Sequence, residues 1–164
     1  MIALRKYDDS DTEEIVTLFY ETVHTINARD YSLEQLDVWA SWDDQETRIA
    51  AWRSSLRRHK TYVAVMDDRI VGFADMSLDG YLDRLYVHKD AQGLGVATTL
   101  VNTLESEAVR LRLTEINTDA SITAKPFFER RGYVVVASQI VERKGIQLTN
   151  FKMRKSLRLL GDGE

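Results

Sequence analysis

The sequence predicts a mixed α/β fold in a single domain, and three observations support this prediction. The chain has 164 residues, of which 44% are hydrophobic, so it can fill one core of its own. Apolar residues recur with a period of two between residues 61 and 87, as in strands, and with a helical period between residues 97 and 113. No internal repeat or linker is visible, and the single proline, Pro126, sits late in the chain. We therefore expect one α/β domain over residues 1–164, with a mainly antiparallel sheet of six to seven strands flanked by helices.

The first 60 residues are expected to be mostly helical. The expected elements are a strand over residues 1–7, a helix over 10–25, a short helix from residue 32 and a helix over 44–58. Ser10 with Glu13, and Ser32 with Gln35, have the spacing of capping boxes, in which two side chains satisfy free N–H groups at a helix start. These two pairs therefore predict where the first two helices begin.

Strands dominate the next part of the chain. Residues 61–66 and 70–75 alternate apolar and polar positions around a tight Asp67-Asp68 turn, and residues 81–87 follow a turn at Asp79-Gly80. We expect these three strands to form an antiparallel meander. The remaining expected elements are a helix over residues 97–113, a strand over 115–119, a helix over 124–131, strands over 133–142 and 146–154, and a flexible tail over 156–164.

Composition excludes several classes of function. The chain has no cysteine, which excludes disulfides, thiolate catalysis and cysteine-ligated zinc, and we expect no metal site. The net charge of -4 argues against a nucleic-acid partner bound through its phosphates. No apolar run approaches the roughly 18 residues of a membrane span, and the first residues lack the apolar centre of a signal peptide. We expect a cytoplasmic protein without a membrane partner.

A glycine-rich segment carries the clearest chemical signal. Residues 92–98 (QGLGVAT) connect the strand over 81–87 to the long helix that follows. A helix start offers free N–H groups and a positive dipole end to a phosphate, and glycine lets the backbone approach it closely. The segment lacks the Gly-Lys-Ser/Thr ending of a nucleotide P-loop, and Thr98 stands where a dinucleotide fingerprint needs its third glycine. The glycines alone leave a phosphate cradle and a simple tight turn equally open.

The residues around this segment resemble the GNAT superfamily of acyl-CoA N-acyltransferases. Gln92, Gly95 and Ala97 match the family's acyl-CoA loop, and residues 85–88 (LYVH) and 124–133 (AKPFFERRGY) resemble its fourth strand and its final helix with the strand after it. Further matches at residues 31–39, 119–128 and 149–151 are similar to a YafP-like bacterial subgroup, so the resemblance spans nearly the whole chain. It implies a fold in which the fourth and fifth strands splay apart.

The resemblance also implies a division of the chain and a co-substrate. Residues 1–60 would form the helical substrate side, 61–137 the acyl-CoA core and 138–155 the terminal strands, with acetyl-CoA as the acyl donor. Backbone groups of Leu85 and Val87 would hold the pantetheine arm and polarise the acyl carbonyl. The residues implied in acetyl-CoA binding are Leu85, Tyr86, Val87, Gln92, Gly93, Leu94, Gly95, Val96, Ala97, Thr98, Ser121 and Phe128.

The implied reaction is direct attack of an amine on the thioester, which needs a base because an alkylammonium has a pKa of about 10. Asp83 is the first candidate, since it lies two residues before Leu85 and therefore on the same strand face. A salt bridge to a neighbouring strand, or a position facing solvent, would also explain an aspartate here. His24 and Tyr31 are weaker candidates. Phe128 stands where the family usually has a tyrosine acid, so the acid is unassigned. Ser121, which replaces the family's asparagine, is a second catalytic candidate, because it could hydrogen-bond the pantetheine or, through a water, the sulfur; it also suits a helix cap.

The acceptor is expected to be a small-molecule primary amine bound near His24, Tyr31, Trp42 and Asp83. Trp39 suits the core better than the site. Asp75, Asp83 and Asp79 would make the cleft acidic and favour a cationic amine. A catalytically silent acyl-CoA sensor and an acetyltransferase acting on protein lysines or N-termini remain alternatives, and the hydrophobic final strands could support a homodimer or merely close the sheet.

Overall fold

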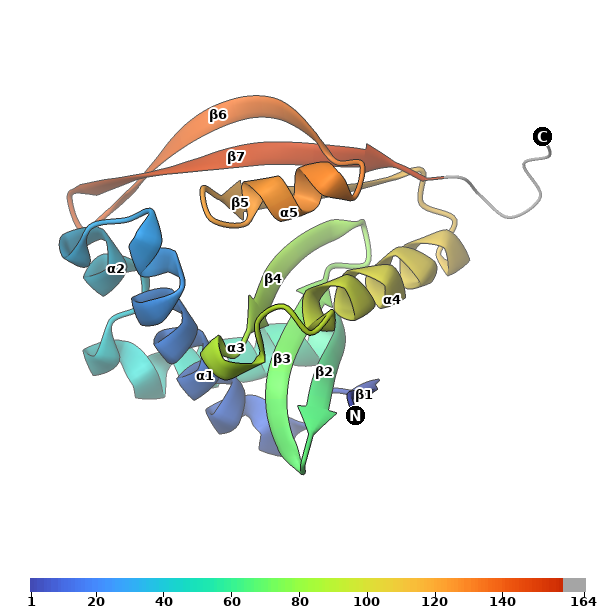
Figure 1. Ribbon diagram of the computed structural model, residues 1–164, viewed down its shortest axis with the longest axis horizontal. Coiled ribbons are helices and arrows are strands. Elements are labelled where there is room, and N and C mark those ends of the chain that lie inside the picture. The colour runs from blue at the N-terminus through green and yellow to red at the C-terminus, as the bar shows by residue number, and fades with distance from the viewer. Residues whose placement is uncertain (158–164) are drawn as a thin grey trace.

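The computed structural model describes residues 1–157, which form one seven-stranded sheet with helices on both faces (Figure 1). The elements in chain order are β1 (Ala3–Lys6), α1 (Thr12–Thr25), α2 (Leu33–Trp39), α3 (Gln45–Arg58), β2 (Lys60–Met66), β3 (Arg69–Met76), β4 (Tyr81–Val87), α4 (Val96–Arg110), β5 (Glu115–Ser121), α5 (Lys125–Arg130), β6 (Val134–Arg143) and β7 (Ile146–Ser156), with short 3-10 turns η1 (Asp9–Asp11), η2 (Asn27–Arg29), η3 (Trp42–Asp44) and η4 (Lys89–Ala91). The α/β prediction is confirmed. Of the tail expected over 156–164, only Ser156 and Leu157 are among the described residues.

The sequence predicted one helix start correctly and one incorrectly. Ser32 and Gln35 form the expected capping box at α2. The box expected from Ser10 and Glu13 is wrong, because the chain first makes the 3-10 turn η1, which Asp8 caps together with Asp11. Helix α1 therefore starts two residues later than expected, at Thr12.

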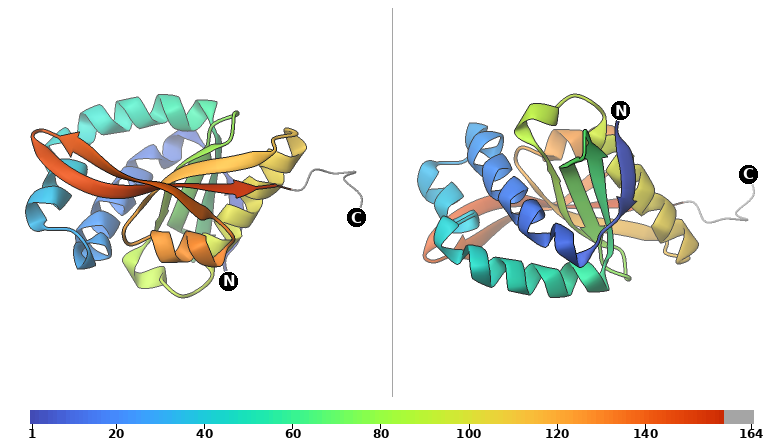
Figure 2. Two further views of the ribbon diagram at one scale, coloured as in Figure 1. Left: turned by 90° about the horizontal axis from the view of Figure 1, so that it is seen from above. Right: turned by 90° about the horizontal axis from the view of Figure 1, so that it is seen from below.

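The sheet has the strand order β1-β2-β3-β4-β5-β7-β6, and every neighbouring pair is antiparallel except β4 and β5. The tight turn between β2 and β3 requires left-handed backbone at both central residues, and Asp67 and Asp68 adopt φ values of 53° and 61°. Figure 2 shows the long β6–β7 hairpin crossing over the rest of the sheet. The mainly antiparallel sheet is thus confirmed.

Strands β4 and β5 pair over only a short stretch. Both strands have seven residues, yet the parallel register joins only Tyr81 to Asn117 and Leu82 to Thr118. Beyond this point the strands diverge, as the resemblance implied. The gap leaves the later part of β4 without a strand partner on its β5 side.

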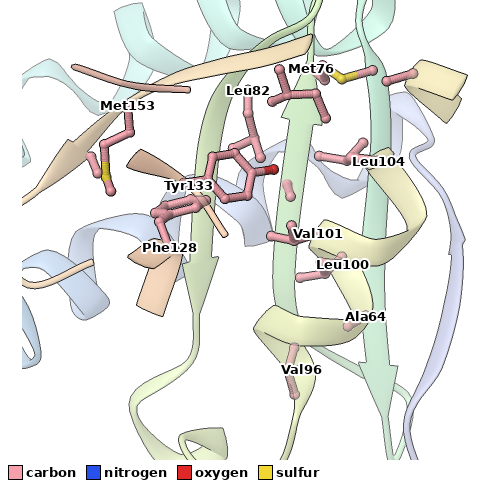
Figure 3. Close-up of a cluster of buried hydrophobic side chains, with 14 of the residues drawn as sticks. Ala64, Met76, Leu82, Val96, Leu100, Val101, Leu104, Phe128, Tyr133 and Met153 are labelled. Carbon is pink, nitrogen blue, oxygen red and sulfur yellow. The ribbon is translucent and has the colours of Figure 1, made fainter. Parts of the chain in front are cut away.

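Two hydrophobic clusters cover opposite faces of the sheet. Helix α4 packs its buried residues, such as Leu100 and Leu104, on one face, where Phe128 and Tyr133 join them (Figure 3). Helices α1 to α3 cover the other face, where Phe19 and Phe73 lie. Among residues 1–157, no helix is both long and apolar enough to cross a membrane. The gap between β4 and β5 lies between these two packed layers.

Candidate functional site

The first cavity lies along the glycine-rich segment, and we call it the loop cavity. It has a volume of about 420 Å³ and is lined by α1, η2, the later part of β4, residues 92–98 except Leu94, the end of β5 and helix α5. Leu94 is 53% exposed and faces away from the cavity. Six of the seven residues that the glycine signal singled out therefore line one cavity.

The segment turns sharply into α4 and leaves the start of that helix uncapped. Gly93 and Gly95 adopt φ values of 76° and 82°, a left-handed conformation that favours glycine. Gly95 is the N-cap of α4 and no side chain caps the helix, whose first intrahelical bond runs from the Thr99 N–H to the Gly95 carbonyl at 3.0 Å. The preceding N–H groups of the first turn, at Val96, Ala97 and Thr98, are thus available to an anion, and a Cβ added at either glycine would meet no other atom within 4 Å.

The edge of β4 supplies a second set of backbone groups, of which the Val87 carbonyl already accepts a bond from Thr22 Oγ1 at 3.2 Å. The N–H of His88 donates to the Val71 carbonyl of β3 at 2.8 Å. Because backbone groups alternate between the two edges of a strand, those of Val87 and Leu85 point the other way, into the gap beside β5. Gln92 Nε2 donates to the Val87 carbonyl at 2.8 Å and so ties the loop to this edge.

A second cavity of about 400 Å³ opens on the other side of the gap, and we call it the aromatic cavity. Its aromatic lining residues are Phe19, Tyr31, Trp39, Trp52, Tyr81 and Tyr86, and its charged ones are Arg48, Arg84, Arg143, Asp83 and Asp119. Five residues line both cavities, namely Trp39, Asp83, Tyr86, Asp119 and Ser121. The two cavities therefore meet at the point where β4 and β5 separate.

Comparison with known proteins agrees with this geometry. Residues 27–155 match the family model described as an acetyltransferase (GNAT) domain. The chain belongs to the GNAT acetyltransferases. It is 35% identical to the N-acetyltransferase YafP of Escherichia coli K12 over 154 residues, which cover 93% of this chain and 95% of YafP. The YafP-like resemblance is thus confirmed.

Solved structures show the same fold. A GCN5-related N-acetyltransferase from Rhodopseudomonas palustris superposes with a TM-score of 0.87 at 37% identity, covering 94% of this chain and 95% of that one. A PaiA N-acetyltransferase from Thermoplasma acidophilum, solved in complex with coenzyme A, gives a TM-score of 0.76 at 18% identity over 95% and 99% of the two chains. Our chain is an acyl-CoA-dependent N-acetyltransferase.

Within this GNAT enzyme, Asp83 lies where the two cavities join. Its side chain is 33% exposed and stands 3.6 Å from Arg84 Nη1. Burial raises the pKa of Asp83, the Arg84 charge opposes this, and the Asp75 charge adds to it. A carboxylate with a raised pKa at a cavity junction is suited to accept a proton.

Asp75 lines neither cavity, although the sequence predicted that it would help to make the cleft acidic. Its side chain is fully buried, accepts a bond from His59 Nδ1 at 2.8 Å and forms an ion pair with Arg84. His59, Asp75 and Asp83 each offer one atom that could bind a metal ion, and these three atoms lie within 4.8 Å of one another. However, the Asp75 carboxylate already accepts a hydrogen bond from the Arg84 guanidinium. Asp79 hydrogen-bonds Ser77 in an exposed turn and lines neither cavity. The acidic cleft expected from Asp75, Asp83 and Asp79 is therefore wrong.

Ser121 and Phe128 both line the loop cavity, and Ser121 also lines the aromatic cavity. The Ser121 hydroxyl accepts a bond from the Ala124 N–H at 3.0 Å, which leaves its own proton free to donate. Phe128 is 2% exposed and packs against Phe127 and Tyr133, with ring centroids 5.3 and 5.0 Å away. Phe128 lines the loop cavity but has no proton to give.

Of the residues expected near the acceptor, His24 and Trp42 lie outside both cavities, whereas Tyr31 lines the aromatic cavity. His24 Nε2 lies 2.8 Å from the Ala40 carbonyl, and Trp42 is 59% exposed against the Tyr20 ring; neither lines the two cavities. Tyr31 lines the aromatic cavity, but its hydroxyl is used structurally, since it donates to the Thr149 carbonyl at 2.6 Å and accepts from the Ile122 N–H at 2.9 Å. Of the three, only Tyr31 can touch an acceptor, and then through its ring.

Sequence reasoning missed Trp52, Arg48 and Arg143 as cavity residues and favoured the core for Trp39, which lines both cavities. Trp52 and Arg48 share one face of α3 at i and i+4 spacing, a pattern that could have been noticed. Arg143 ends β6 far along the chain, and no spacing pattern links it to α3. The basic side of the aromatic cavity arises only from tertiary packing.

Proposed function

We propose that the enzyme transfers the acetyl group of acetyl-CoA to a primary amine of a small molecule, with the donor in the loop cavity and the amine in the aromatic cavity. The observation that carries this proposal is that the two cavities meet at the β4–β5 gap, where Asp83 lines both. A base at the junction faces donor and acceptor at once. The aromatic cavity, at about 400 Å³, has the size of a small-molecule site.

The loop cavity fits the donor in two places. The uncapped N–H groups of Val96, Ala97 and Thr98 suit a pyrophosphate, because the positive end of α4 points at the same spot. The gap-facing backbone of Leu85 and Val87 suits the amides of a pantetheine arm. The Thermoplasma acidophilum structure of the same fold holds coenzyme A, which supports this assignment.

Asp83 acts as the general base in this proposal. The amine nitrogen bonds to the acetyl carbon, the carbon–sulfur bond breaks, and the proton lost by the nitrogen passes to the Asp83 carboxylate. A backbone N–H at the gap, such as that of Leu85 or Val87, stabilises the negative charge that develops on the carbonyl oxygen. The departing thiolate takes its proton from the Ser121 hydroxyl or from water, since Phe128 has none to give.

A thiol-release assay with a panel of primary amines tests the proposal. Because the chain has no cysteine, a thiol reagent reports only the coenzyme A that is released. We expect turnover with small primary amines, and Asp83→Asn should lower kcat by about 10²- to 10⁴-fold, the usual contribution of a general base. Asp79→Asn is the matched control, because Asp79 lies in an exposed turn outside both cavities.

Two results would contradict the proposal. If acetyl-CoA binds tightly and no amine gives turnover, the protein is an acyl-CoA sensor. If only peptides with a free lysine or N-terminus react, the acceptor is a protein. Full activity of Asp83→Asn at every pH would instead remove Asp83 from the mechanism and leave the acetyl transfer intact.

A further inference from the structure

We infer that the amine acceptor carries an anionic group at the end remote from its amine, and that Arg48 and Arg143 bind this group in the aromatic cavity. The inference rests on the proposed function, because it names the class of acceptor for that same cavity. It replaces the cationic amine that the sequence suggested.

Two arginines line the aromatic cavity without a carboxylate partner. Arg84 also lines it, but Asp75 neutralises that charge. Among residues 1–157, neither Arg48 nor Arg143 forms an ion pair, although the neighbouring Lys144 pairs with Asp44 at 3.3 Å. An anion entering the cavity would therefore find two guanidinium groups that have no carboxylate partner among residues 1–157.

Arg48 is held in place by neutral groups only. Its Nη1 and Nη2 each donate to a carbonyl at 3.3 Å, those of Ser41 and Trp39, and its guanidinium lies 5.1 Å from the Phe19 ring centroid. These contacts use two of the five N–H donors of a guanidinium. Burial lowers the pKa of Arg48, and the Arg143 charge lowers it further, against the opposing charge of Asp44. Two neighbouring like charges, one of them half-buried, are stabilised when an anion joins them.

The acidic residues of the cavity do not compensate these charges. Asp119 accepts bonds from Tyr81 Oη and Gln139 Nε2, each at 2.8 Å, and Asp83 lies next to Arg84. Both acids line the junction with the loop cavity, whereas Arg48 and Arg143 line the aromatic cavity alone. The cavity is thus acidic where the amine must react and basic away from that point.

The hairpin that carries Arg143 is fixed against the helices at three points. Lys144 pairs with Asp44 of η3, Gln35 Nε2 of α2 donates to the Gln147 carbonyl at 2.9 Å, and Tyr31 Oη donates to the Thr149 carbonyl. These links hold the end of β6, and with it the backbone of Arg143, beside the start of α3, which carries Arg48. Trp52 and Phe19 supply an apolar wall between the two ends of the acceptor.

Matched acceptors test the inference. We would compare 4-(aminomethyl)benzoate with its neutral isostere 4-(aminomethyl)benzamide and with 4-(aminomethyl)phenylphosphonate, all of which have the same amine. The wild-type kcat/KM should favour the carboxylate over the amide by roughly 10- to 150-fold, the value of one charge-assisted hydrogen bond. The ratio between phosphonate and carboxylate then identifies which anion the arginines prefer.

Arg143→Gln is the decisive variant, because this exposed side chain has no ion pair within the described residues. The acid-to-amide ratio should fall close to one, because the variant loses the charge that distinguishes the carboxylate from the amide. Arg154→Gln removes the same charge from the exposed face of β7 outside both cavities and should leave the ratio as in the wild type. A ratio near one in the wild type, or a ratio unchanged by Arg143→Gln, would overturn the inference.

Binding without turnover separates this inference from the proposed function. Trp39 and Trp52 line the cavity, so 4-methylbenzoate should change the tryptophan fluorescence at lower concentration than 4-methylbenzamide does. If no amine is acetylated but Arg143→Gln abolishes 4-methylbenzoate binding, the anion site stands and the proposed function fails. If charged and neutral amines are acetylated equally well and 4-methylbenzoate binds no more tightly than 4-methylbenzamide, the anion site is wrong and the proposed function stands.

Discussion

The contact between Gly72 and helix α4 leads to the most direct test of how the fold supports the loop cavity. Gly72 lies in β3 directly beneath the start of α4. A Cβ added there would lie 2.7 Å from Val96 Cγ1 and 3.3 Å from both Leu100 Cδ1 and the Tyr86 carbonyl oxygen. Val96 and Leu100 are 1% and 0% exposed, so neither can move into free space. Gly72 is not among the glycines with positive φ, so only space forbids alanine.

The expected loss of stability in Gly72→Ala follows from two opposing effects. Overpacking a filled core costs about 1–3 kcal/mol, while replacing glycine returns about 0.4–1 kcal/mol by restricting the unfolded chain. From the middle of each range, the net loss in the free energy of unfolding is about 1.3 kcal/mol, or about 3–5 °C in Tm for a domain of this size. Because Val96 also begins α4, its displacement should weaken coenzyme A binding about tenfold, the low end of the value of one charge-assisted hydrogen bond.

Thermal melts and calorimetric titration with coenzyme A measure both effects, and a second substitution isolates their cause. Val96→Ala removes the atom that clashes, so Gly72→Ala with Val96→Ala should be more stable than the sum of the single changes by about 0.5–3 kcal/mol. Wild-type Tm and wild-type affinity in Gly72→Ala, or purely additive changes in the double variant, would refute the reasoning.

Three further predictions concern the junction and the aromatic cavity. Asp75→Ala should lower the free energy of unfolding by about 3–5 kcal/mol, measured by urea unfolding, because it leaves Arg84 without its buried partner; a change below about 0.5 kcal/mol would contradict this. The wild-type kcat/KM should fall as the pH drops through the raised pKa of Asp83, since the protonated carboxyl accepts no proton, and Asp83→Asn should lose this acidic limb in its pH profile. Tyr31→Phe should cost about 1–3 kcal/mol in a thermal melt, because the Thr149 carbonyl and the Ile122 N–H lose their partner. It should also raise the KM for the amine more than that for acetyl-CoA, since Thr149 lines the aromatic cavity; equal changes in both KM values would argue against this.

Local patterns allowed most of the fold to be predicted from the sequence. The alternation in residues 61–87 gave the meander, and the glycines before Val96 gave the start of α4, because these signals depend on neighbours along the chain. The start of α1 was missed because Asp8 and Ser10 both favour a cap, and only the preceding 3-10 turn decides between them. Local signals thus identify elements better than they identify element boundaries.

The electrostatics of the site could not be predicted in the same way. Asp75 and Asp83 are similar carboxylates in sequence, but one is fully buried against Arg84 and the other opens into both cavities. Arg48 and Arg143 come together only because the β6–β7 hairpin packs on the helices. Since no residue spacing records these contacts, the sequence indicated the residues that line the loop cavity but gave no sign of the basic side of the aromatic cavity.

The absence of a tyrosine at position 128 fits a reaction whose two proton transfers differ in difficulty. An alkylammonium with a pKa of about 10 is almost fully protonated at neutral pH, so its attack depends on a base. A thiol has a pKa of about 8.5, so a departing thiolate is a modest base that water or a hydroxyl can protonate after the bond breaks. Losing the acid therefore affects the rate less than losing the base. The residues of the site follow the same order, because Asp83 has a raised pKa and lines both cavities, while Phe128 lines the loop cavity and has no proton to give.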